Sequence, residues 1–544
     1  FVSSSNMAES KTKMEKQQKP RRGVQFAKGM TGTDVCKAVL GAAMEVVDAE
    51  AAAKVRKERN WRWKYSHHFV KLNEIAASSP DVALQVAQAG LASLNEYFAC
   101  ADGKGGQVPL QAAMSPSSES SQQPYYSAEV VGSVDFQPVD LTIPVPGKEL
   151  SGQALLQQMD TWVQRGVIEP SALDAVTALV HNKELLDLRG HHFVLLGAGS
   201  AMGPIESLLS FGATIHAVEL PRPAVWKRIL GLVRTSPGRL VLPLATPPPE
   251  DLSDEWLAAH AGCNLTEEPA AVAAWVVKQA PEERLVLGTY VYLDGAMFSQ
   301  VAVAADAIAQ SVCAQRGGVD SPNGVALAYL NSPTEVHCVP EEAHQAAKSR
   351  ASGLHNVWEQ PIRVLSRERY LEPNRPLAVS PKDGSCPALL LQDSVVWSQG
   401  PNYCFAKQLQ KWRAMLARSQ GHLCSCTVGP ATLTESVMHN RLVAAGMLGC
   451  EHFGIEAFRV ATSNSLLAAM LVWDLRSGFS SYAHPSHPLR SPLELFQQNA
   501  CHGGTWRAAF KTNSYTEVSA LLYFLGKARP WLLTSAAGAA AWKY

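Results

Sequence analysis

The stretch that decides the fold is HFVLLGAGSAMGP, residues 192–204. Residues 192–196 read as a short buried strand, and the remainder forms a turn rich in glycine. Apolar residues then recur at helical spacing over 205–209, and a second apolar run follows over 213–220. Strand, turn, helix and strand in this order predict a βαβ unit.

The glycines of this turn predict a nucleotide site. A pyrophosphate approaches the backbone closely at a helix N-terminus, where free N–H groups and the helix dipole favour an anion, and a Cβ atom would obstruct this approach. Glu219, near the end of the second strand, is placed to accept hydrogen bonds from a ribose diol. The alternative is a glycine turn of any doubly wound α/β domain, since a glycine motif alone is a weak sign. The turn residues expected to bind the cofactor are Gly197, Gly199, Ser200, Met202 and Gly203.

The composition is that of a globular protein without an overall charge bias. Of the 544 residues, 47% are hydrophobic and 18% are charged, and 48 Lys and Arg balance 48 Asp and Glu. This balance provides no global footprint for nucleic acid or an anionic membrane. No apolar run reaches the roughly 20 residues of a membrane span. The 11 cysteines lack the spacing of a zinc site, so we expect reduced thiols and no metal. We also expect a soluble protein of the cytoplasm or of an organelle interior, such as a plastid or mitochondrion.

Composition also divides the chain into segments. A polar, basic stretch comes first, and residues rich in Gly, Ser, Gln and Pro separate an α-helical region from the remainder. We predict a disordered tail at 1–30, an α-helical region at 31–100, a linker at 101–149, a helical lead-in at 150–190, the first half of an α/β domain at 191–340, an insertion at 341–385, the second half at 386–480 and a C-terminal extension at 481–544.

Strands and helices alternate beyond Glu219. Continuous apolar runs predict strands at 239–244, 284–292, 325–330 and 388–391. Helical periodicity predicts helices at 224–233, 270–278 and 298–313. This alternation is typical of a mainly parallel sheet. The predicted fold class is therefore α/β, with a doubly wound, Rossmann-like parallel sheet, an N-terminal α-helical region and a C-terminal helical extension.

A second set of residues points to proton transfer. Tyr403 and Lys407 are four residues apart, so on a helix they share one face. A lysine ammonium beside a phenol lowers the pKa of the phenol from its ordinary value of about 10, which lets the tyrosine exchange a proton near neutral pH. Ser394 and Ser398, which follow the preceding strand, are candidates to polarise a carbonyl. The alternative is that Tyr403 only packs between helices and that Lys407 is solvated.

With these residues the chain resembles the short-chain dehydrogenase/reductase family, whose marks are a glycine-rich turn, a later Tyr-x-x-x-Lys and an upstream serine. The turn at 197–203 matches the first motif in its outer glycines, and Tyr403-x-x-x-Lys407 matches the second. The order of the pieces agrees as well, and the resemblance covers residues 190–440.

The resemblance implies further cofactor contacts. Asn264-Leu265-Thr266 resembles the segment of the family that contacts adenine. Gly288-Thr289-Tyr290 replaces the family's asparagine-rich motif after the fourth strand. By this resemblance Asn264, Leu265 and Gly288 join the residues expected to bind the cofactor.

The leading hypothesis is an oxidoreductase that uses a pyridine nucleotide. Hydride passes between the nicotinamide and a carbonyl or alcohol of a small-molecule substrate, while Tyr403 gives or takes the proton and Lys407 tunes it. NAD is expected rather than NADP because the carboxylate of Glu219 repels a 2′-phosphate, and Arg222 weakens this preference.

Two other functions fit the same pattern. An S-adenosylmethionine-dependent methyltransferase also begins with a strand, a glycine turn, a helix and an acid at a strand end, but it has no use for the Tyr403 and Lys407 pair. A catalytically inactive Rossmann-like scaffold would use its helical additions to bind a protein partner, and a homo-oligomer is a further alternative to a monomer.

Overall fold

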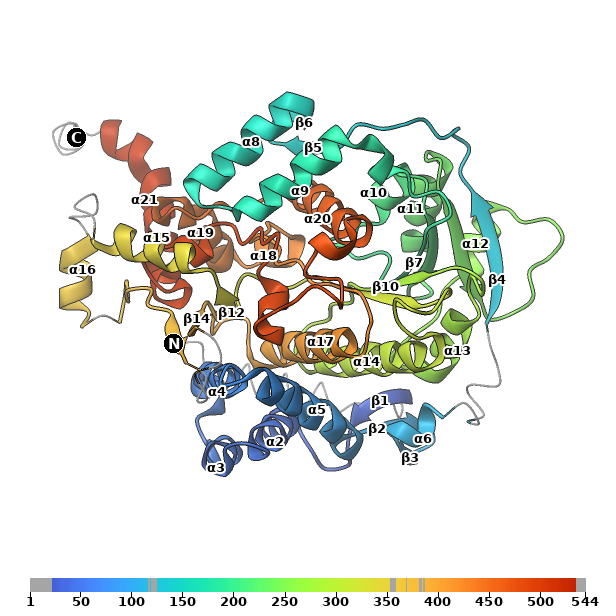
Figure 1. Cartoon of the computed structure of the whole chain (residues 1–544), viewed down its shortest axis with the longest axis horizontal. Helices are drawn as coiled ribbons and strands as arrows, with labels where there is room; N and C mark the ends of the chain where they lie inside the picture. Colours follow the sequence, from blue (N-terminus) through green and yellow to red (C-terminus); the bar gives the residue numbers. More distant parts are fainter. Residues whose placement is uncertain are drawn as a thin grey trace.

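The computed structural model describes residues 22–115, 118, 125–352, 359–367, 369–380, 384 and 387–534. Its centre is a seven-stranded sheet in the order β15-β11-β10-β7-β8-β9-β4 (Figure 1). Its strands are parallel except β4, which runs antiparallel to β9 at one edge. The strands are β4 Tyr126–Val131, β7 His192–Leu196, β8 Thr214–Val218, β9 Arg239–Leu244, β10 Leu285–Thr289, β11 Val325–Tyr329 and β15 Cys424–Ser425. The fold is mixed α/β and is compatible with a Rossmann-like fold.

The alternation predicted from the sequence builds this sheet. β7 and β9 span the residues predicted for them, and β8, β10 and β11 lie inside their predicted runs. In β10, Leu287 pairs with Val194 of β7 on one side and with Leu327 of β11 on the other. All residues of β8 and β10 are buried, as expected for parallel strands that are covered on both faces.

Helices cover both faces of the sheet (Figure 1). One face packs against α13 Pro269–Val277, α14 Ala296–Arg316 and α17 Pro401–Ser419. The other packs against α9 Pro170–His181, α10 Ile205–Ser210, α11 Pro223–Arg234 and α20 Val460–Arg476. Two further helices belong to this region, α8 Gly152–Arg165 and α12 Asp254–His260.

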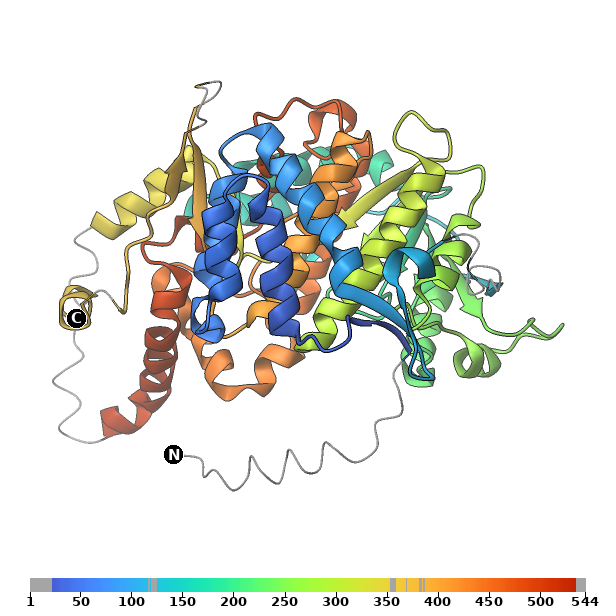
Figure 2. The ribbon, with the colours of Figure 1, turned by 90° about the horizontal axis from the view of Figure 1, so that it is seen from below.

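The N-terminal α-helical region lies against α17 and α14. Its helices are α2 Gly32–Glu45, α3 Ala49–Lys57, α4 Trp61–Ala76 and α5 Pro80–Tyr97. Figure 2 shows these helices, in blue, lying beside the sheet's helical layer. α5 approaches α17 closely at Gly90, because a Cβ atom there would lie 2.4 Å from the Trp412 ring. α17 is therefore held between the sheet and the N-terminal helices, which limits its freedom to shift.

Two predicted boundaries are wrong. Residues 22–26 of the predicted tail form β1, Arg22–Phe26, which pairs with β2, Phe98–Asp102. Residues 1–21 of that tail lie outside the described residues. The predicted linker contributes β4, the edge strand of the main sheet, and also contains β3 Gln107–Pro109, α6 Leu110–Ala113, β5 Thr142–Val145 and β6 Lys148–Ser151. Short strands whose outer faces are polar have the composition of a loop, so the prediction missed them.

The strand predicted at 388–391 exists but does not resume the main sheet. It is β14, Leu389–Asp393, and it lies between β12, Val336–Val339, and β13, Leu377–Val379, in a separate antiparallel sheet. The predicted insertion at 341–385 therefore belongs to a small unit that begins with β12. Its described helices are α15 Glu341–Ser352 and α16 Glu359–Leu365.

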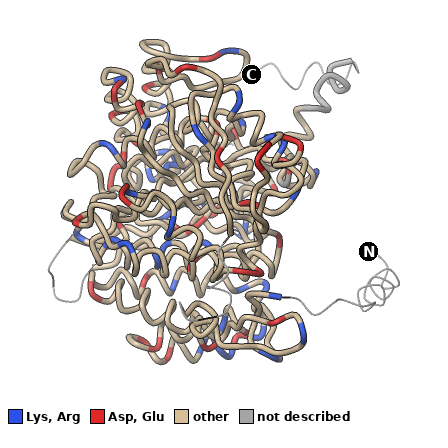
Figure 3. Tube along the Cα trace, turned by 90° about the vertical axis from the view of Figure 1, so that its right-hand side faces the viewer, with Lys and Arg blue, Asp and Glu red and all other residues tan. Residues whose placement is uncertain are grey.

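The predicted C-terminal extension, 481–544, contains α21 Thr512–Thr534 and short 3₁₀ turns in its described part, 481–534, while α18 Glu435–His439 and α19 Arg441–Gly449 lie before it. Figure 3 shows basic and acidic residues interspersed along the trace, without a long stretch of one sign.

One described helix, α14, is long and apolar enough to cross a membrane by length and composition. No apolar run long enough to span a membrane was expected from the sequence. In this structure α14 packs against α13, α17 and β11, and residues such as Phe298, Val303 and Ile308 are buried there. Its apolar composition is accounted for by this packing against the sheet.

Candidate functional site

The glycine-rich turn connects β7 to α10 and is bonded to the end of β8. The N–H groups of Gly197 and Ala198 both donate to the carbonyl oxygen of Val218. Gly197 has a φ of +82°, which favours glycine, and a Cβ atom there would lie 3.1 Å from the backbone nitrogen of Val291. The loop that follows β10 therefore packs directly on the turn.

Gly199 has a different reason to be glycine from the one predicted. A Cβ atom at Gly199 would lie 2.6 Å from Cγ1 of Val225 and 2.9 Å from Oε2 of Glu219. Its N–H donates a hydrogen bond of 2.8 Å to the same Oε2. Close packing of Glu219 and α11 thus requires glycine here, whether or not a phosphate approaches. At Gly203 a Cβ atom would lie 3.3 Å from the carbonyl oxygen of Ser200, a tight contact.

The turn is also bonded from both sides. Arg228 of α11 donates to the carbonyl oxygen of Gly199 over 2.7 Å. Nδ2 of Asn464, on α20, donates to the carbonyl oxygen of Ala201 over 2.8 Å. α10 follows as a short helix of six residues with Pro204 at its N-cap. Because proline has no N–H group, this end offers fewer free donors than the predicted helix N-terminus.

Glu219, Asn264 and Leu265, which were predicted to contact the adenosine part of the cofactor, lie close together in the structure. The N–H of Cys263 donates to the backbone oxygen of Glu219 over 2.9 Å, so the segment that holds Asn264 and Leu265 lies beside the end of β8. Oδ1 of Asn264 accepts from the Thr266 N–H over 3.1 Å, and the Leu265 side chain is buried. Asn264 therefore shapes the turn that precedes α13. The Glu219 carboxylate remains partly exposed.

Gly288, a predicted cofactor residue, lies within β10, inside the strand predicted at 284–292. It is a buried residue of β10, and a Cβ atom there would lie 2.4 Å from Cε2 of Tyr290. Gly288 makes room for this ring. The residue that reaches the site from β10 is Tyr290 itself.

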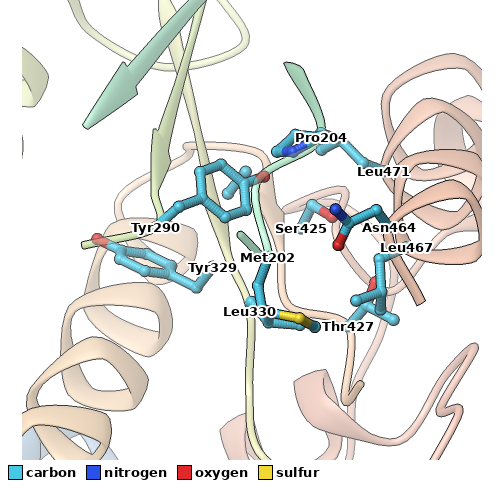
Figure 4. Close-up of a pocket in the computed structure, with 11 residues that line it drawn as sticks. Met202, Pro204, Tyr290, Tyr329, Leu330, Ser425, Thr427, Asn464, Leu467 and Leu471 are labelled. Atoms are coloured by element: carbon cyan, nitrogen blue, oxygen red, sulfur yellow. The ribbon is translucent and has the colours of Figure 1, made fainter. Parts of the chain in front are cut away.

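A small pocket lies at the carboxyl ends of the parallel strands. Figure 4 shows Met202 and Tyr290 reaching into the space between the strand ends and α20. Oδ1 of Asn464 is buried there and has no hydrogen-bond partner among the described residues. The lining residues are Met202, Pro204, Tyr290, Ala328, Tyr329, Leu330, Ser425, Thr427, Asn464, Leu467 and Leu471.

Tyr403 and Lys407 lie on one face of α17 and point toward the chain that leaves β11. The Ser332 side chain lies beside the Tyr403 phenol and acts to lower its pKa. The Ser332 hydroxyl itself is bonded to Oγ1 of Thr334 over 2.7 Å. Nζ of Lys407 donates to the carbonyl oxygen of Leu330 over 2.6 Å and to Oε1 of Gln410 over 3.2 Å. Both side chains are partly exposed. A serine, a tyrosine and a lysine therefore meet at the carboxyl end of β11.

The predicted effect of Lys407 on Tyr403 is wrong in this structure. Burial, and after it the negative charge of Glu335, raises the pKa of Tyr403 well above its ordinary range, although the neighbouring Ser332 side chain acts to lower it. Burial also lowers the pKa of Lys407. The ammonium of Lys407 is bonded to Leu330 and Gln410, so Tyr403 keeps its proton at neutral pH.

The predicted serines do not reach Tyr403. Ser394 is fully buried, its N–H donates to the backbone oxygen of Glu335 over 3.2 Å, and its hydroxyl has no partner among the described residues. Ser398 is exposed in the turn that precedes α17. Ser332 contacts the phenol instead. Ser332 lies two residues after the predicted strand 325–330, so its position at a strand end was the signal in the sequence that could have identified it.

Aromatic rings flank Tyr403 on its other side. The Phe298 and Tyr403 ring centroids are 5.6 Å apart, and those of Tyr292 and Tyr403 are 6.4 Å apart. Tyr292 is about half exposed, and its hydroxyl donates to Asp294 over 2.8 Å. Within the described residues, no three His, Cys, Asp or Glu side chains come together as a metal site would need.

Comparisons with known proteins leave the site's geometry as the basis for a function. No protein-family model matches the chain, and a search of curated proteins finds no match.

Proposed function

We propose that the chain is an NAD(P)-dependent oxidoreductase of the short-chain dehydrogenase/reductase type, which reduces a carbonyl compound or oxidises the corresponding alcohol. The observation that carries this proposal is that Tyr403 and Lys407 share a face of α17 beside the chain that leaves β11, with Lys407 bonded to Leu330 and the phenol beside Ser332. The tyrosine and lysine come from the helix that leads into the last strand, β15, and the serine comes from the segment that follows β11.

The topology supports a doubly wound, Rossmann-like arrangement. Numbered along the parallel strands, the order β9-β8-β7-β10-β11-β15 is 3-2-1-4-5-6, with β4 added at the edge. In such sheets ligands bind outside the carboxyl ends of the strands, where the order reverses. That point lies between β7 and β10, where the glycine-rich turn meets Val291 and where Met202 and Tyr290 line the pocket.

The residues at this point fit a dinucleotide. The partly exposed Glu219 carboxylate has lone pairs left for ribose hydroxyls beyond the two backbone N–H groups that it accepts. A Cβ atom at Gly199 would collide with that carboxylate and with Val225, so a larger residue would alter the turn that has to face a pyrophosphate. Glu219 favours NAD, and the exposed Arg222 leaves NADP as the alternative. When bound, the cofactor supplies or accepts the hydride.

The chain's own residues supply the acid and the orientation. The Ser332 hydroxyl donates to the carbonyl oxygen of the substrate and polarises it, and the Tyr403 phenol gives that oxygen a proton. Lys407 orients α17 through its bond to Leu330. Burial raises the pKa of Tyr403, so the phenol carries its proton near neutral pH and is available as the donor, but it is a weaker acid than an ordinary phenol.

The test is NADH and NADPH oxidation against a panel of aldehydes, ketones and quinones. We expect the wild type to reduce at least one of them, and Tyr403→Phe to lower kcat by about 100-fold or more while cofactor affinity stays near wild type. Tyr515→Phe is the control, because Tyr515 is a tyrosine buried in the separate C-terminal core, away from Tyr403.

Three outcomes are informative. Wild-type kcat in Tyr403→Phe on an active substrate would rule out this mechanism. Binding of S-adenosylmethionine and of neither nicotinamide cofactor would favour the methyltransferase. If no nucleotide binds, the inactive scaffold becomes the better account.

A further inference from the structure

The face of α17 that carries Tyr403 and Lys407 continues for one more turn to Lys411. All three side chains contact the chain between β11 and β12. Nζ of Lys411 lies 3.0 Å from Oε2 of Glu335 and donates to the carbonyl oxygen of Val336 over 2.7 Å. This ion pair is deeply buried, since the side chains of Lys411 and Glu335 are 3% and 5% exposed.

Glu335 uses its other oxygen to hold the serine of the proposed site. Its Oε1 accepts a hydrogen bond of 2.6 Å from the backbone N–H of Ser332. The carbonyl oxygen of Ser332 lies 2.7 Å from Nε2 of His337. Burial lowers the pKa of His337 to about 3, so its ring is neutral, and Nε2 donates to Ser332 while Nδ1 faces Lys411 at 3.4 Å.

The pair is a costly way to stabilise a fold. Two charges that are buried lose their hydration, and their mutual attraction offsets little more than this desolvation penalty. An apolar pair of similar volume often gives the same stability. A buried ion pair can instead specify one arrangement of the chain around it. Here that arrangement is the turn at 332–335, with Ser332 against Tyr403.

We propose that Lys411 and Glu335 are positioning residues, which hold the Ser332 hydroxyl in hydrogen-bond reach of Tyr403 and of a substrate carbonyl. The role rests on the proposed function. It assigns α17 three successive tasks on one face: Tyr403 transfers the proton, Lys407 ties the helix to the end of β11, and Lys411 fixes the serine through Glu335.

The test replaces both charges at once, since Lys411→Met alone would leave the Glu335 carboxylate buried and unpaired. The double variant is Glu335→Leu with Lys411→Met. Its matched control is Asp306→Leu with Arg413→Met, because Asp306 and Arg413 form another buried ion pair of α17, with an N–O distance of 2.7 Å, toward α14. Glu335→Gln is the conservative variant, since a Gln oxygen still accepts from Ser332.

Hydrogen exchange provides a readout that needs no substrate. We expect the backbone around Ser332 to exchange about tenfold faster in the Glu335/Lys411 variant, because its N–H loses its acceptor, and to keep wild-type protection in Glu335→Gln and in the Asp306/Arg413 control. Wild-type protection in the Glu335/Lys411 variant would overturn the proposal.

Turnover provides the second readout. We expect kcat of the Glu335/Lys411 variant to fall about tenfold, with little change in KM for the cofactor. Adding Ser332→Ala should lower kcat no further, because both changes remove the action of the same Ser332 hydroxyl. Equal losses in the Asp306/Arg413 control, or losses that multiply with Ser332→Ala, would overturn the positioning role. A wild type that turns over no substrate would instead overturn the proposed function, and the catalytic part of this proposal with it.

Discussion

The ammonium nitrogen of Lys407 lies 2.6 Å from the carbonyl oxygen of Leu330, and this bond joins α17 to the end of β11. The next residue but one after Leu330 is Ser332, which lies beside Tyr403. Lys407 therefore acts on the proposed site by fixing where the helix and the strand end meet. It is not the group that sets the protonation of Tyr403.

This distinction predicts the behaviour of Lys407→Met. We expect kcat for carbonyl reduction to fall about tenfold, because the helix loses a charge-assisted hydrogen bond worth roughly 1.5 to 3 kcal/mol. The pH dependence of the remaining activity should match that of the wild type, with no new fall between pH 7 and 9, as the pKa of Tyr403 is raised by burial in both proteins. Rates measured across this range check it. A pH optimum that differs between Lys407→Met and the wild type would show that Lys407 does lower the pKa of Tyr403.

Glu219 is expected to select the cofactor. Glu219→Ala removes the repulsion of a 2′-phosphate and should narrow the difference in binding free energy between NADH and NADPH by about 1 kcal/mol. It also removes the acceptor of the Gly199 N–H, so NADH affinity itself should fall. Fluorescence titrations with both cofactors measure this, and Glu255→Ala, at an exposed position on α12, is the control. A wild type that prefers NADPH would mean that Arg222 outweighs Glu219.

Asp474 is expected to make stability depend on pH. Burial raises its pKa to about 6, against hydrogen bonds from Ser425, Ser481 and Asn499. In the unfolded chain the pKa of an aspartate is about 3.9. Between these values the folded state binds the proton more tightly, so the free energy of unfolding should increase as pH falls from 6 to 4, by about 3 kcal/mol for a two-unit shift.

Asp474→Asn should abolish this contribution, which urea unfolding between pH 4.5 and 7.5 measures as the difference between the two proteins. The difference is needed because His216 and His337, whose pKa values burial lowers to about 3, destabilise both proteins as pH falls below 6.5. A difference that does not vary with pH would show that Asp474 stays ionised throughout.

The parallel sheet could be predicted from the sequence because its strands are continuous apolar runs. β7 and β9 have the predicted bounds, since buried parallel strands carry few polar residues to blur them. β14 was placed in the wrong sheet because a short apolar run does not reveal its partner, and β4 was missed because an edge strand alternates with exposed residues.

The site was predictable only in part, for a similar reason. Four-residue spacing placed Tyr403 and Lys407 on one face, because helical geometry is local. Ser332 lies 71 residues before Tyr403, on the far side of the small unit formed by β12, β13 and β14. Sequence distance therefore favoured Ser394 and Ser398. Burial also reversed the expected pKa shift of Tyr403, and burial depends on tertiary packing that spacing does not contain.

The most direct test of the account is calorimetric titration of the full chain with NADH. The account predicts saturable binding to the wild type, loss of binding in Gly199→Val, where the new side chain would collide with Val225 and Glu219, and wild-type affinity in Gly231→Ala, a helical glycine with open space around it. No binding to the wild type, or the same affinity in Gly199→Val, would contradict it.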